Sequence, residues 1–72
     1  MKFVITVKID FGHSSGNLYY SDTTSDFMVF DIHDAKKFDH FDYAEDMTHL
    51  LPKTLYSHLE YVQLEIIEYK AV

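Results

Sequence analysis

KFVITVKIDF, at residues 2–11, carries the strongest structural signal in the chain. Its apolar side chains recur at every second position, which is the period of a strand that buries one face and exposes the other. The apolar set is Phe3, Ile5, Val7, Ile9 and Phe11, and it alternates with Lys2, Val4, Thr6, Lys8 and Asp10. We therefore predict a half-buried β-strand here, around which a small sheet is built.

Polar and apolar stretches alternate after this strand. We expect turns at residues 12–17 and 21–26, because glycine, serine, asparagine and aspartate favour turn conformations. Residues 18–20 lie between the two turns and are predicted as an optional short strand. Residues 27–33 are predicted as a further strand, with Met28, Phe30 and Ile32 on its inward face.

An amphipathic helix is predicted next, because apolar and polar residues fall on opposite sides of a helical wheel. The apolar side holds Phe41, Ala44, Met47, Thr48 and Leu51, and the polar side holds Asp39, Asp42, Glu45, Asp46 and His49. Residues 34–38 are expected to form a separate turn, which leaves Asp39 as the N-cap. Pro52 is expected to end the helix near Leu50, because a proline disfavours helical angles at the preceding residue.

The last segment fits two patterns. Val62, Leu64 and Ile66 alternate with polar residues as in a strand, whereas Leu55, Leu59, Val62, Ile66 and Tyr69 match a helical repeat. We favour the strand, because β-branched and aromatic residues fit a pleated surface.

These elements predict one α+β domain over residues 1–72. Its antiparallel sheet has three or four strands, and one helix packs on one face, in the order β-β-α-β. The first strand is expected at the centre of the sheet, with the last strand antiparallel to it.

The composition points to a basic protein partner. Twelve acidic residues face six basic ones, all of them lysine, so the net charge is −6. Direct binding to nucleic acid or to an anionic membrane is disfavoured, because both require a basic patch. The chain has no cysteine, no signal-peptide pattern and no run of apolar residues long enough to span a membrane. We expect a cytoplasmic protein, located in the host cytoplasm if the gene is carried by a phage.

One helix covers only one face of such a sheet, so the other face is a candidate partner-binding surface. It is predicted to mix apolar residues with acids, and exposed apolar surface of that kind often marks an interface. The candidate residues on this open sheet face are Val4, Phe27, Val29, Tyr61, Glu65, Ile67 and Tyr69. Three interpretations remain open: Tyr19, Tyr20 or the C-terminal residues fold over this face, a second copy covers it in a homodimer, or a foreign partner does.

The polar side of the helix is the second candidate surface. Its carboxylates, on Asp39, Asp42, Glu45 and Asp46, form what we call the acidic helix face. They act either as a solvated surface that keeps the protein soluble or as a mimic of the phosphates of nucleic acid.

Catalytic and metal-binding motifs are weak. The five histidines lack the HExxH spacing, no calcium-binding loop is present, and Ser14 and Ser15 beside His13 lack the context of a serine nucleophile. We therefore expect no catalytic residue, no metal and no cofactor. A small metal-dependent enzyme is kept as the second alternative.

In its size, acidity and lack of catalytic motifs, the chain resembles small phage-encoded inhibitors of host defence, such as anti-CRISPR proteins and DNA mimics. The likeness is one of overall profile, so it assigns no role to any residue. It suggests a non-enzymatic module that binds a host enzyme acting on nucleic acid. The first alternative is a homo-oligomeric structural or accessory protein that associates through its open sheet face.

Overall fold

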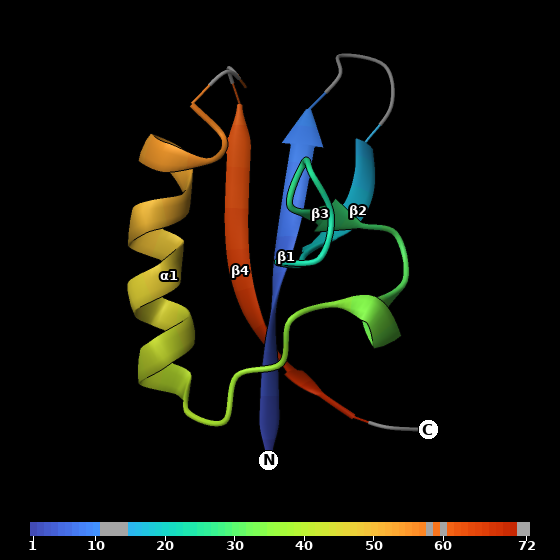
Figure 1. Cartoon of the computed structure of the whole chain (residues 1–72), viewed down its shortest axis with the longest axis vertical. Coiled ribbons are helices and arrows are strands. Elements are labelled where there is room, and N and C mark those ends of the chain that lie inside the picture. The colour runs from blue at the N-terminus through green and yellow to red at the C-terminus, as the bar shows by residue number, and fades with distance from the viewer. Residues whose placement is uncertain (11–14, 58, 60, 71–72) are drawn as a thin grey trace.

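The computed structural model describes residues 1–10, 15–57, 59 and 61–70. Its elements, in chain order, are β1 (Lys2–Asp10), β2 (Ser15–Tyr20), β3 (Met28–Val29), the 3₁₀ helix η1 (Ile32–Asp34), α1 (Phe41–Thr54) and β4 (Val62–Tyr69). The described residues form one four-stranded sheet in the order β3-β2-β1-β4, and α1 packs against β1 and β4 (Figure 1). The predicted α+β class, with an antiparallel sheet and one helix on one face, is confirmed.

The first strand lies inside the sheet, as its sequence pattern predicted. β1 pairs antiparallel with β2 on one side, with Thr6 opposite Tyr19, and antiparallel with β4 on the other. The pairing with β4 runs without a break from Lys2 opposite Tyr69 to Ile9 opposite Val62. The strand prediction for residues 62–69 is therefore confirmed.

β2 begins earlier than the short strand predicted at residues 18–20. Residues 15–17 belong to β2 and not to a turn, because each of them pairs with a residue of β1. Phe11 and residues 12–14 lie outside the described residues.

The predicted strand at residues 27–33 is wrong beyond Val29. Phe30 is 88% exposed, so it does not face inward. The Asp31 carboxylate then accepts a hydrogen bond of 2.9 Å from the His33 amide and so caps η1. A short acidic side chain that bonds to the nearby backbone competes with strand pairing, and here it ends the sheet.

Both predicted ends of the helix are also wrong. His40 occupies the N-cap position without a side-chain cap, and Asp39 bonds to the Lys2 ammonium instead. Pro52 lies inside α1 and does not end it. Bonds of 2.9 and 3.0 Å to the carbonyl of buried Leu51, from the amides of Leu55 and Tyr56, stabilise the last turn beyond the proline.

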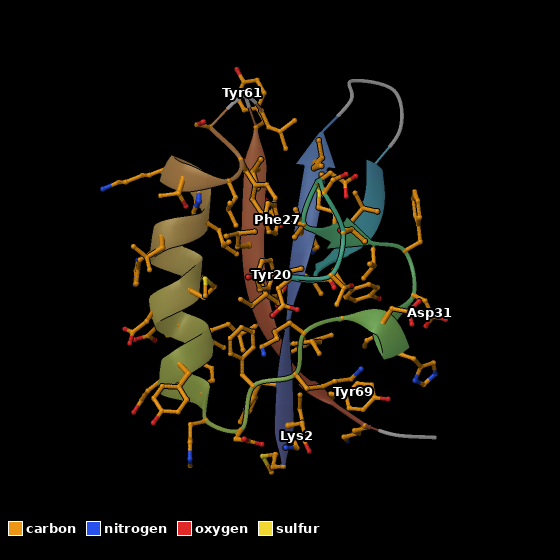
Figure 2. The ribbon with its side chains drawn as sticks, viewed as in Figure 1. Lys2, Tyr20, Phe27, Asp31, Tyr61 and Tyr69 are labelled. Carbon is orange, nitrogen blue, oxygen red and sulfur yellow. The ribbon has the colours of Figure 1, made fainter. Side chains whose placement is uncertain are left out.

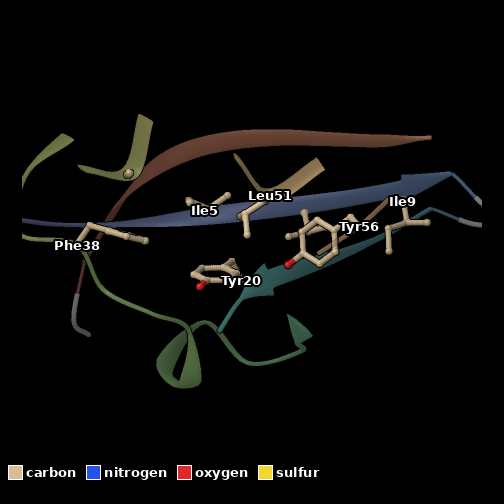
Figure 3. Packing of buried hydrophobic residues seen from close by; sticks show 8 residues of the cluster. Ile5, Ile9, Tyr20, Phe38, Leu51 and Tyr56 are labelled. Carbon is tan, nitrogen blue, oxygen red and sulfur yellow. The ribbon is translucent and has the colours of Figure 1, made fainter. Parts of the chain in front are cut away.

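The core lies between the sheet and α1 (Figure 3). Its buried members are Ile5, Val7, Ile9, Tyr20, Phe38, Ala44, Leu51 and Tyr56. Residues 35–38 extend the β2 side of the sheet, since Phe3 and Phe38 exchange backbone bonds of 2.9 and 2.8 Å. This segment carries the Phe38 ring to the helix side of the sheet, where it stacks on Tyr20 with ring centroids 6.3 Å apart.

Candidate interaction surfaces

The acidic helix face is exposed along its whole length. Asp39 lies just before α1, and its bond to the Lys2 ammonium, together with the lysine charge, lowers the pKa of its carboxyl group. Asp42, Glu45 and Asp46 project from α1 and have no ion pair among the described residues. The free carboxylates on this face therefore come from those three residues.

Large apolar side chains accompany these acids on the same helix. Tyr43 is 61% exposed and Leu50 is 56% exposed. They are seven residues apart, which is close to two helical turns, so they lie on one flank of α1. The spacing of Tyr43 and Leu50 is visible in the sequence. We nevertheless missed them there, because we considered only the apolar residues expected to face the core.

Phe41 is a third partly exposed apolar residue of α1, at 46%. Its ring packs edge-on against Phe3 of β1, with centroids 5.7 Å apart. This contact packs the first turn of the helix against the sheet.

The sheet face turned away from α1 gathers five of the seven predicted residues. The pairing puts Val4 opposite Ile67, and Thr6 between Glu65 and Tyr19. Tyr69 lies opposite Lys2, and Val29 lies opposite Tyr19. The predicted residues on this face are Val4, Val29, Glu65, Ile67 and Tyr69.

The other two predicted residues of the open sheet face lie elsewhere. Phe27 precedes β3 and packs against the core on the helix side. Its backbone has φ of 59°, a left-handed conformation that takes it out of the strand. Tyr61 precedes β4 and is 70% exposed, at the end of the sheet opposite Lys2 and Tyr69 (Figure 2).

One end of this face is covered, since Val4 is 0% exposed although it points away from the helix. The bridge between Phe3 and Phe38 places Lys37 beside Val4 on the β2 side, and Tyr69 lies on the β4 side. The Lys37 ammonium nevertheless sits 4.9 Å from the centre of the Tyr69 ring. Its side chain therefore crosses β1 close to Val4.

A histidine completes this cover. The Nδ1 atom of His33 and the Tyr69 hydroxyl share a hydrogen bond of 2.8 Å, and the Lys37 ammonium donates to the His33 carbonyl oxygen. We call His33, Lys37 and Tyr69 the roof. The chain itself therefore covers this end of the face, but through His33, Lys37 and Tyr69 and not through Tyr20, which lies in the core on the helix side. No sequence pattern pointed to Lys37.

Beyond the roof the face is mainly polar. The Thr6 hydroxyl donates a 3.0 Å bond to the Glu65 carbonyl oxygen, and the Lys8 ammonium lies 3.5 Å from the Glu65 carboxylate. Both ionic side chains are exposed, so this pair contributes little stability.

The described residues contain no group of three or more histidine and acidic side chains placed to hold a metal ion. No helix in the described part of the chain has the length and apolar character needed to cross a membrane.

Comparisons with protein-family models, with curated proteins and with solved structures gave no significant match. Function is therefore inferred from the surfaces described above.

Proposed function

We propose that the protein is a non-enzymatic binding module that recognises a basic protein surface through the exposed side of α1. The observation that carries this proposal is the combination, on one helix, of large exposed apolar side chains with carboxylates that form no ion pair within the described part of the chain. Tyr43 and Leu50 supply apolar contact area, and Asp42, Glu45 and Asp46 supply charge.

Each component has a distinct physical role. In a typical interface, most of the affinity comes from a few residues, often tyrosine, that the partner buries at the centre. Charges at the rim accelerate association and select the partner. A net charge of −6 disfavours acidic surfaces and favours a lysine- or arginine-rich partner.

Inhibition of a host enzyme that handles nucleic acid is the narrower form of this proposal. The segment from Asp39 to Asp46 is about 10 Å long, at about 1.5 Å per helical residue. Duplex DNA carries one charge per ~1.7 Å of its axis, so the same length of duplex carries about six charges. The acidic helix face has four carboxylates from Asp39 to Asp46, and that of Asp39 is bonded to Lys2. This density supports the recognition of a basic surface more than close imitation of a duplex.

Self-association through the open sheet face is the alternative. It has less support, because Val4 is buried beneath the roof and Phe27 and Tyr61 lie off this face. Sedimentation of the wild-type protein separates the two, since the alternative requires a dimer.

The direct test is capture from a lysate of the source cells with four forms of the protein: the wild type, two charge variants and Leu50→Ser. The test variant carries Asp42→Asn, Glu45→Gln and Asp46→Asn. The control removes the same number of charges elsewhere, through Asp22→Asn, Asp26→Asn and Asp34→Asn. We expect a captured protein that is retained by the control, lost by the test variant and lost when Leu50→Ser is introduced. Equal capture by both charge variants contradicts the proposal.

A further inference from the structure

One edge of the sheet is open. β4 ends the strand order, so among the described residues its far edge has no strand partner (Figure 1). The backbone N–H and C=O groups along such an edge are ready to pair with another strand. The opposite edge offers much less, because β3 has only two residues.

β4 has few of the features that prevent strand addition. Sheet edges are commonly protected by proline, by a bulge or by charged side chains, lysine above all. VQLEIIEY holds neither proline nor lysine, and its register with β1 is continuous over all eight residues. Its only charged residues are Glu65 and Glu68, which repel acidic strands but not basic ones.

The side chains of β4 also leave apolar surface uncovered. Val62, Leu64 and Ile66 face α1, yet each is only half-buried, whereas Ile5 and Val7 on the same face of β1 are fully buried. The core therefore becomes incomplete toward the open edge. An added strand would cover the outer sides of these residues.

We propose that the open edge of β4 accepts an extended, basic segment of a partner protein as a further strand. This inference rests on the proposed function and specifies the form of the partner: lysine or arginine alternating with β-branched residues. The backbone of β4 supplies the hydrogen bonds, and its half-buried apolar row supplies the contact for the β-branched side chains.

Charge selects a foreign segment over a second copy of the chain. A second copy brings a net charge of −6 against −6 and a second pair of glutamates along the same edge. In a basic strand whose β-branched side chains lie beside Val62, Leu64 and Ile66, the lysine or arginine side chains lie on the other face of the sheet, next to Glu65. Glu68 lies on the face of the apolar row, because it pairs with Phe3. The carboxylates of α1, the helix that packs against β4, add to the same field.

The probe is a synthetic peptide of alternating lysine and valine, equal in length to β4. Its control has the same side chains and charge, but every backbone nitrogen is methylated, so it cannot donate hydrogen bonds. We expect the unmethylated peptide to bind at least about tenfold more tightly, because several backbone bonds of about 1 kcal/mol each are lost in the control. Amide hydrogen exchange of the protein should slow in β4 when the unmethylated peptide binds.

The other outcomes separate this inference from the proposed function. Equal binding of both peptides, weakened by the substitutions at Asp42, Glu45 and Asp46, shows recognition by charge alone and overturns strand addition while keeping the proposed function. Binding of neither peptide overturns strand addition, and the lysate experiment still decides the proposed function. A dimer in sedimentation, with β4 amides already protected, overturns the inference because a second copy then occupies the edge.

Discussion

The side-chain hydroxyl of Tyr56 donates a hydrogen bond to the main-chain carbonyl oxygen of Phe27, with 2.6 Å between the two oxygens. This bond joins the segment after α1 to the loop before β3, which lie 29 positions apart in the chain. Both partners are held firmly: Tyr56 is 1% exposed, and Phe27 packs against the same core.

Tyr56→Phe should therefore destabilise the protein without changing the fold. The substitution keeps the ring but removes the donor and leaves the Phe27 carbonyl oxygen without this bond. We expect a loss of about 1 kcal/mol in the free energy of unfolding, measured by urea denaturation. Tyr61→Phe is the control, because the Tyr61 side chain is exposed, and it should change stability by less than about 0.5 kcal/mol.

Alkaline pH should weaken the fold through the buried tyrosines. Burial, with smaller contributions from Tyr20 and Asp26, raises the pKa of Tyr56 well above its ordinary value. Burial and then Asp22 raise the pKa of Tyr20. Above about pH 10 the unfolded chain releases phenolic protons that the folded chain retains, so the folded state loses stability as the pH rises.

The measurement is the unfolding free energy as a function of pH. The tyrosine contribution should be flat below about pH 9, where the phenols are neutral in both states, and should decrease above about pH 10. The decrease should be shallower in Tyr56→Phe than in the wild type. An equally steep decrease in both proteins would contradict the assignment to Tyr56.

Phe27 allows a test of backbone strain. A residue with a Cβ atom is disfavoured at φ of 59°, and glycine is not. Phe27→Ala and Phe27→Gly remove the same ring and differ only in that atom. We expect the glycine variant to be more stable than the alanine variant by about 1 kcal/mol in urea denaturation. At most positions an alanine variant is more stable than a glycine variant. The same order here would show that residue 27 does not adopt the left-handed conformation.

The elements with long, regular patterns were predictable from the sequence. β1 alternates clearly enough for one face to be assigned, and buried Ala44 and Leu51 lie on the predicted stripe of the helix. Periodicity of this kind reports which face is buried, and burial is what stabilises these elements. For β4 a helical repeat fitted as well, and its β-branched and aromatic residues decided for the strand.

The elements that depend on distant partners were not predictable. Gly16 reads as a turn residue, yet it lies in β2 because Ile9 of β1 pairs with it. The roof depends on Lys37 reaching across β1 to Tyr69, a contact between residues far apart in the sequence. The acidic helix face was predictable, because helical spacing alone places Asp42, Glu45 and Asp46 on one side.

Pro52→Ala should stabilise α1. Proline at this position removes one hydrogen bond, to the carbonyl oxygen of Thr48 one turn earlier, and crowds that turn. We expect a gain in the free energy of unfolding of up to about 3 kcal/mol, the cost of a proline inside a helix. Unchanged stability would mean that the contacts of Leu51 and Tyr56 alone fix the end of the helix.

Val4 tests whether the roof seals one end of the outer face. Val4→Ala removes two buried methyl groups at about 0.8 kcal/mol each and leaves a cavity, so a loss of about 2 kcal/mol is expected in urea denaturation. Val29→Ala is the matched control on the same face. Because Val29 is only half-buried, Val29→Ala should lower the free energy of unfolding by less than about 1 kcal/mol.

Lys37→Ala, which removes the side chain that crosses β1, should make the backbone amide of Val4 exchange its hydrogen faster than in the wild type. Equal costs for the two valine variants, together with unchanged exchange in Lys37→Ala, would show that this end of the face is open to solvent.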